Sequence, residues 1–133
     1  MIGKIAPYRD YLYATLRIVS GYAFSLHGAQ KLFGVLGSDG VPLFSMMGFA
    51  GIVEFFGGVL ISVGLFTSQF AFIASGQMAV AYFVGHVTVN GAALFPVVNR
   101  GEAAILYCFL FLYLSAHGAG NWSLDNVRKH YRR

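Results

Sequence analysis

Charged residues and cysteines are scarce in this sequence of 133 residues. Only 11 % of the residues are charged and 57 % are hydrophobic, whereas an ordinary soluble domain has roughly 25 % charged residues. A soluble fold of this size could not hide so much apolar surface, so we expect lipid to solvate it. The single cysteine, Cys108, excludes an internal disulfide and any metal site built from several cysteines.

Several motifs that carry chemistry are also missing. The sequence has no glycine-rich phosphate loop after a strand, no nucleophile elbow, no paired-histidine motif such as HExxH and no c-type haem motif. The net charge of +4 would suit nucleic acid, but the basic residues gather at the two termini and not along one face. We therefore expect no nucleic-acid partner.

The apolar residues form four stretches long enough to cross a bilayer, which takes about 20 mostly apolar residues per helix. Turn-forming residues separate the stretches, as in GSDGVP and TSQ. We predict one all-α membrane domain over residues 1–133. Its four transmembrane helices form a bundle and span about 11–36, 48–66, 70–89 and 101–117.

Basic residues flank this bundle before the first span and after the last one: Lys4, Arg9, Arg128, Lys129, Arg132 and Arg133. Four spans bring both termini to the same side of the membrane, and the positive-inside rule places that side in the cytoplasm. We therefore expect a multi-pass protein of the inner (plasma) membrane with both termini cytoplasmic.

The polar residues of the spans fall at two depths when each helix is laid out at 1.5 Å per residue. An outer layer receives side chains from all four helices: His27, Lys31, Glu54, His86, Asn90, Asn99 and Glu102. A sparser inner set consists of Arg17, Gln77 and His117. The outer layer is the candidate site, because polar groups from four helices converge there.

Glu54 is the strongest candidate for a functional residue. Gly58 and Ser62 follow it at every fourth position, which puts Glu54 on a face of small residues where helices approach closely. An unpaired charge at mid-membrane costs about 2.5–3.5 kcal/mol on insertion scales. We therefore expect Glu54 to pair with Lys31 or Arg17, and depth favours Lys31.

The other candidates have ordinary structural explanations that the sequence leaves open. Lys31 could extend to the outer headgroups, and His27 and His86 could each bond a neighbouring helix. Arg17 could reach the cytoplasmic headgroups, and Glu102 begins a helix, where the dipole favours a carboxylate. The histidines and glutamates come from four helices without a paired motif, so we predict no metal site.

Four stretches, in this order, resemble the DoxX family of small four-helix membrane proteins: LRIVSGYAFSLHGAQKLFG, GIVEFFGGVLISVGLFT, MAVAYFVGHV and NRGEAAILYCFLFLYLSAHGAGNWSLD. The resemblance covers roughly residues 12–125. One departure is Gly118-Ala119-Gly120, where the family has a turn similar to Gly-Pro-Gly. The family pattern marks these positions of the chain: Arg17, His27, Gly28, Lys31, Glu54, Gly57, Gly58, His86, Glu102, Ser123 and Asp125.

The resemblance implies a four-helix bundle in the inner membrane and a link to redox chemistry. Some members of the family are subunits of a thiosulfate:quinone oxidoreductase. Others resemble proteins linked to quinone or catechol stress, or to membrane complexes with soluble redox enzymes. The family thus implies a fold more specifically than it implies a reaction.

The first hypothesis for the function is a quinone-linked redox subunit. His27, His86 and Lys31 would donate hydrogen bonds to the carbonyls of a bound quinone, and Glu54 would relay protons, which makes these four the candidate catalytic residues. Two further residues complete the candidate quinone ligands: Glu102 and Arg17. The sequence has no flavin, haem or iron–sulfur motif. A partner redox protein would therefore deliver the electrons, and the chain would be at most a subunit of an oxidoreductase.

Two other functions stay open. In the first, the chain is a membrane scaffold for a redox or stress-response complex, and the tail NWSLDNVRKHYRR docks a cytoplasmic protein or anionic lipid. In the second, the polar layer lines a path for a small molecule or a proton. That path would need a homo-oligomer, because four helices make a narrow bundle.

Overall fold

The computed structural model describes residues 2–91 and 93–131, which form helices and loops without a β-strand. Two short 3₁₀ turns, η1 (Ile2–Lys4) and η2 (Ala6–Tyr8), lead into the long helix α1 (Arg9–Phe33). The second long helix runs without a break through three segments: α2 (Met46–Ile52), the π-helical η3 (Val53–Gly57) and α3 (Gly58–Val63).

The third long helix continues from α4 (Thr67–Val80) into a second π-helical segment, η4 (Ala81–Val87). The short α5 (Pro96–Asn99) precedes α6 (Glu102–His117), and α7 (Leu124–Tyr131) follows. The second and third long helices are long and apolar enough to cross a membrane, whereas α6 is apolar but shorter. The all-helical prediction is confirmed for the described residues, and the bundle of four spans stays a prediction.

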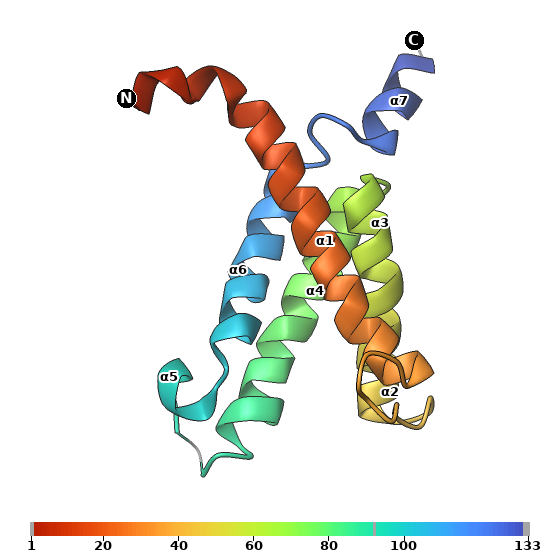
Figure 1. Cartoon of the computed structure of the whole chain (residues 1–133), viewed down its shortest axis with the longest axis vertical. Coiled ribbons are helices and arrows are strands. Elements are labelled where there is room, and N and C mark those ends of the chain that lie inside the picture. Colours follow the sequence, from red (N-terminus) through yellow and green to blue (C-terminus); the bar gives the residue numbers. More distant parts are fainter. Residues whose placement is uncertain (1, 92, 132–133) are drawn as a thin grey trace.

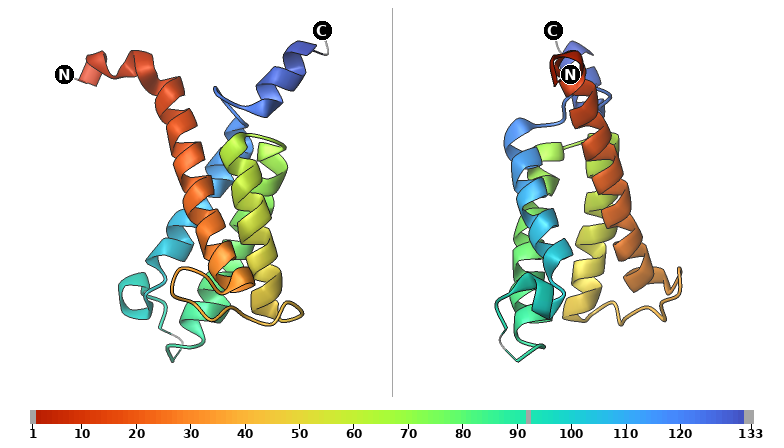
Figure 2. Two further views of the ribbon diagram at one scale, coloured as in Figure 1. Left: turned by 45° about the vertical axis from the view of Figure 1, so that its right-hand side comes forward. Right: turned by 60° about the vertical axis from the view of Figure 1, so that its left-hand side comes forward.

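The long helices lie in two pairs, α1 beside α2–α3 and α4 beside α6 (Figures 1 and 2). The N-terminus and α7 lie at one end of the bundle, which we call the terminal end (Figure 1). The connections over residues 34–45, 88–91 and 93–101 lie at the opposite end, which we call the loop end. Each long helix therefore contributes side chains to both ends.

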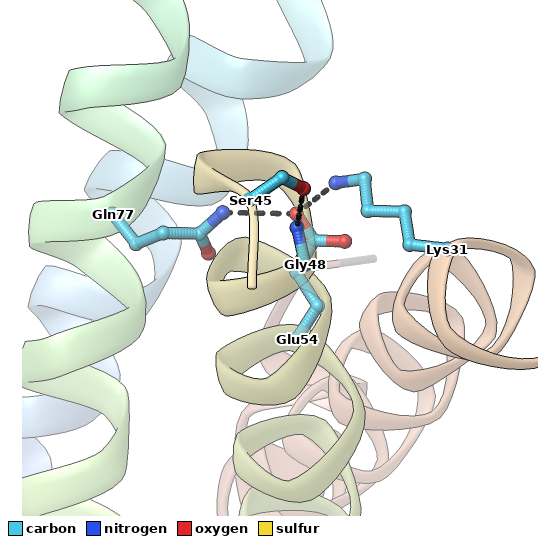
Figure 3. Close-up of polar contacts among 5 residues, drawn as sticks. All are labelled: Lys31, Ser45, Gly48, Glu54 and Gln77. Carbon is cyan, nitrogen blue, oxygen red and sulfur yellow. Dashed lines mark hydrogen bonds and ion pairs between the residues drawn. The ribbon is translucent and has the colours of Figure 1, made fainter. Parts of the chain in front are cut away.

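Local capping explains where the helices depart from the predicted spans. α1 ends at Phe33 because Gly34 adopts a left-handed φ of 61° and donates its N–H to the Gln30 carbonyl at 3.2 Å. The second helix begins two residues before the predicted boundary at 48. There the Ser45 hydroxyl accepts the N–H of Gly48 at 3.0 Å, which is an N-cap (Figure 3).

Glycines bring α1 close to the second helix. A Cβ on Gly21 would lie 2.6 Å from the backbone nitrogen of Ser62 and 2.7 Å from the carbonyl oxygen of Gly58. Ser62 also donates its hydroxyl hydrogen to the Ile18 carbonyl of α1 at 3.1 Å. The predicted face of small residues thus packs backbone against backbone, as is typical of helices in membranes.

We expect Gly21→Ala to lower the stability of the fold by about 1–3 kcal/mol, the usual cost of overpacking, because the added methyl meets backbone that cannot rotate away. The apparent Tm of the detergent-purified protein measures this loss. Gly76→Ala is the control, since a Cβ there meets nothing within 4 Å. An equal Tm for both variants would contradict the close approach.

Candidate functional site

A cavity of about 610 Å³ opens in the half of the bundle nearer the loop end, bounded by α1, the second helix, α4 with η4, and α6. This volume lies in the range of small-molecule sites, roughly 300–1,000 Å³. Most of its walls are apolar or aromatic. Its polar and aromatic lining includes four of the predicted site residues and two others: His27, Lys31, Glu54, His86, Gln77 and Tyr107.

Glu54 is the centre of the polar wall. Its side chain is almost fully buried, with 1 % of the residue exposed. One carboxylate oxygen, Oε1, forms an ion pair with the Lys31 ammonium and accepts a hydrogen bond from Gln77 Nε2 at 2.9 Å (Figure 3). Because these residues belong to α1, η3 and α4, a single oxygen links three helices.

Two acceptor atoms of this cluster have no hydrogen-bond donor among the described residues. They are Glu54 Oε2 and Gln77 Oε1, and both atoms are buried. Figure 3 shows them pointing away from the shared oxygen in different directions. An unsatisfied buried polar group costs about 1–3 kcal/mol. The cluster therefore has unused capacity to accept hydrogen bonds.

His86 adds a further acceptor from η4. Its Nδ1 lies 3.1 Å from the Asn99 carbonyl oxygen, and because a carbonyl only accepts, this nitrogen carries the hydrogen. Nε2 of the neutral ring is then an acceptor. Asn99 is fully buried and fixed by its own bonds, an Nδ2–H donated to the Ala93 carbonyl at 2.8 Å and Oδ1 accepting the N–H of Gly101 at 2.7 Å.

His27 lies beside an aromatic cluster at the cavity wall. Its ring faces Tyr107 edge-on with the centroids 6.5 Å apart, and Tyr107 stacks on Phe111 at 5.4 Å. Phe24 packs against both of these rings. Within residues 2–91 and 93–131, His27 makes no hydrogen bond, so both ring nitrogens are free for a ligand.

Both π-helical segments carry a polar residue of the cavity, Glu54 in η3 and His86 in η4. A π-turn adds a residue to a helical turn, which shifts the direction of the side chains that follow, and such turns are frequent at functional sites. The regular α-helical spacing of about 100° per residue does not hold through these segments. No residue type marks them in the sequence.

The cavity does not include the other two predicted ligands. Glu102 is exposed in the first turn of α6, where its carboxylate faces the positive end of the helix dipole. Arg17 is fully buried and lies nearer the terminal end. Its guanidinium donates to four backbone carbonyls, at distances of 2.5–3.1 Å: Ile61, Ser62, Asn121 and Trp122.

Asp125 completes the attachment of the tail at the terminal end. Its two carboxylate oxygens accept the backbone N–H groups of Phe66 and Thr67, each at 3.0 Å, at the start of α4. Its own N–H donates to the Gly64 carbonyl at 2.8 Å. Burial alone would raise the pKa of Asp125, but the hydrogen bonds from Thr67 and Phe66 outweigh burial and lower the pKa.

Gln77 is the site residue that the depth estimate missed, because it assigns Gln77 to the inner set. The hairpin between the second and third helices contains the signal that would have found it. Glu54 precedes Leu65 by 11 residues, and Gln77 follows Phe66 by 11 residues. Residues equally far from a tight antiparallel turn face each other, so counting from the hairpin pairs Glu54 with Gln77.

We expect Lys31→Met to destabilise the protein strongly, because it leaves the Glu54 carboxylate buried without its cation. Breaking a buried ion pair costs about 3–5 kcal/mol, and the low end applies here since Lys31 is partly exposed. The double variant Lys31→Met/Glu54→Gln removes both charges and should recover most of the lost Tm. Equal Tm values for the single and double variants would contradict a structural ion pair.

A pH titration tests the attachment of the tail. A lowered pKa means that the Asp125 carboxylate stabilises the fold above its unfolded pKa of about 3.9, and that this contribution is lost as pH falls through the folded pKa. Asp125→Asn should cost about 1–2 kcal/mol at pH 7, because the amide keeps one acceptor oxygen but leaves one of the two backbone N–H groups without an acceptor. The difference in Tm from wild type should close below pH 4. Asp10→Asn, in an exposed ion pair with Arg9, should change little at either pH.

Comparison with known proteins places this site in a family. An uncharacterized protein from Haemophilus influenzae is 44 % identical over 129 residues, which cover 94 % of this chain and 96 % of that protein. No solved structure matches the chain.

The family model named DoxX matches residues 12–87, more than half of the chain. The match runs from α1 through η4 and so includes all the polar residues of the cavity wall. It confirms the family that the sequence resembles, and together with the two long apolar helices it indicates a membrane protein. The chain belongs to the DoxX family.

Proposed function

We propose that the chain is a four-span protein of the inner membrane with both termini in the cytoplasm. Large apolar side chains on the outside of the bundle support lipid contact, since Val19, Phe72 and Leu106 are each more than half exposed. Two elements at the terminal end contain basic residues, Lys4 in η1 and Arg128 in α7, and these support the orientation through the positive-inside rule. In this orientation the cavity lies in the outer half of the membrane.

We further propose that the cavity binds the ring of a quinone-type molecule. The observation that carries this proposal is the buried Glu54 cluster in the wall of a large, otherwise apolar cavity. Ligand sites typically combine apolar walls with a few fixed polar groups. The aromatic wall at Phe24 and Tyr107 suits a flat ring, and the polar wall suits its oxygen substituents.

Each polar residue then has a role toward the ring oxygens. His27 and Lys31 donate hydrogen bonds to them, and His86 Nε2 accepts a hydrogen bond from a ring hydroxyl once the ring is reduced. A quinone takes up two protons with two electrons when it is reduced, and Glu54 exchanges these protons through Oε2. The electrons come from a partner redox protein, because the sequence has no flavin, haem or iron–sulfur motif. The chain is thus an oxidoreductase-associated subunit.

Extraction of the purified protein into organic solvent, followed by mass spectrometry for quinones, tests this function. We expect about one quinone per chain in the wild type. The variant Lys31→Met/Glu54→Gln should lose at least about tenfold, because it lacks two charged hydrogen-bonding groups that are each worth about 1.5–3 kcal/mol.

Glu102→Gln is the matched control, since it removes the same charge from an exposed position outside the cavity. It should retain the wild-type quinone content. No quinone in the wild type, or equal amounts in both variants, would rule out a quinone site at the Glu54 cluster.

A scaffold function is the second candidate, and the exposed surface of α7 favours it. Leu124 and Val127 are about half exposed on this helix and Tyr131 is almost fully exposed, next to the basic Arg128 and Lys129. Such a surface suits an acidic partner protein or anionic lipid. If the chain is a scaffold, we expect the purified protein to contain no quinone. We also expect Lys129→Glu to weaken binding of the partner to α7 without changing the Tm.

A further inference from the structure

The unpaired polar atoms of the Glu54 cluster favour some ligands over others through the kind of hydrogen bond that they can form. Its two orphaned atoms, Glu54 Oε2 and Gln77 Oε1, are both acceptors and both buried. A ligand that brings hydrogen-bond donors satisfies them. A ligand that brings only acceptors leaves them unsatisfied and adds the repulsion of facing lone pairs.

The unused donors of the cavity do not offset this preference. His27 lines the cavity as an exposed residue, outside the buried cluster, and Lys31 is partly exposed. Lys31 is already bound to Glu54 Oε1 as well. The free energy of binding thus depends more on filling the orphaned acceptors than on supplying partners to the donors, because the acceptors are buried and Lys31 already has a partner.

A third residue of the cavity wall, His86, also offers a hydrogen-bond acceptor. Nε2 of the neutral His86 ring accepts, because Nδ1 donates to the Asn99 carbonyl. Asn90 helps to hold that carbonyl, with its Nδ2 at 3.3 Å from the Asn99 oxygen and 2.8 Å from the His86 carbonyl oxygen. The tautomer of His86 is therefore fixed by its neighbours.

We propose that the cavity selects the reduced, hydroxyl-bearing form of its ring ligand, a diphenol, over the oxidised quinone. One ring hydroxyl donates to Glu54 Oε2, and Gln77 Oε1 and His86 Nε2 are the acceptors for further donors of the ligand. This inference rests on the proposed function, because it assumes that a ring of this class occupies the cavity. It concerns binding alone and needs no electron transfer.

Glu54→Gln is the sharpest probe of this preference. Oε1 already accepts from Lys31 and Gln77, so the oxygen of the new amide stays at that position. Its NH₂ group then replaces Oε2. The variant turns the orphaned acceptor into a donor at the same place with almost the same shape, which should favour a quinone carbonyl over a hydroxyl.

The test measures the dissociation constants of tetramethyl-1,4-benzoquinone and its hydroquinone for the detergent-purified full chain, without oxygen, by isothermal titration. We expect the hydroquinone to bind the wild type about tenfold more tightly, which corresponds to about 1.4 kcal/mol. Glu54→Gln should bring this ratio to one or below. Glu102→Gln should leave the ratio unchanged, and a Tm for each variant checks that it is folded.

The possible outcomes separate this inference from the proposed function. Equal binding of the two forms, or tighter binding of the quinone by the wild type, overturns the selection of the reduced form and leaves a quinone site standing. A tenfold preference that Glu54→Gln does not change overturns the assignment to Glu54. Binding of neither form overturns the quinone site, and the inference falls with it.

Discussion

The carboxylate oxygen Oε1 of Glu54 is the point on which the polar organisation of the bundle depends. It receives Lys31 from α1 and Gln77 from α4, so three helices meet at one atom. In a chain with so few charged residues, a buried carboxylate without partners would be prohibitively costly. The pair and the amide make its burial possible, and they also fix the position of the carboxylate of Glu54, which is a lining residue of the cavity.

Much of this arrangement follows from the sequence. Helix periodicity and the cost of a buried charge predict the helices and the pairing of Glu54 with Lys31, and the structure forms that ion pair. The pairing is predictable because a deep carboxylate needs a cation at the same depth, and only Lys31 and Arg17 were available.

The remaining details depend on features that sequence patterns do not carry. The π-helical segments change the phase of the helix at Glu54 and at His86 without a characteristic residue. Arg17 binds backbone carbonyls, which every residue has, so no partner side chain identifies its role in the sequence. The cavity is a property of four helices together, since its lining residues come from sequence positions as distant as Phe24 and Tyr107.

Two cations of α1, Arg17 and Lys31, differ in how completely their partners are satisfied, and this difference supports a ligand at the cavity. Arg17 and Lys31 lie 14 residues apart, or roughly 21 Å along the helix at 1.5 Å per residue. Arg17 donates four hydrogen bonds to carbonyls of the chain itself, and only its Nε lacks a partner. That set joins the tail to the bundle. Lys31 binds the carboxylate of a cavity-lining residue, and the second oxygen of this carboxylate is buried and unsatisfied. An unsatisfied buried acceptor costs about 1–3 kcal/mol, and a hydrogen bond from a donor on a bound ligand would remove this cost.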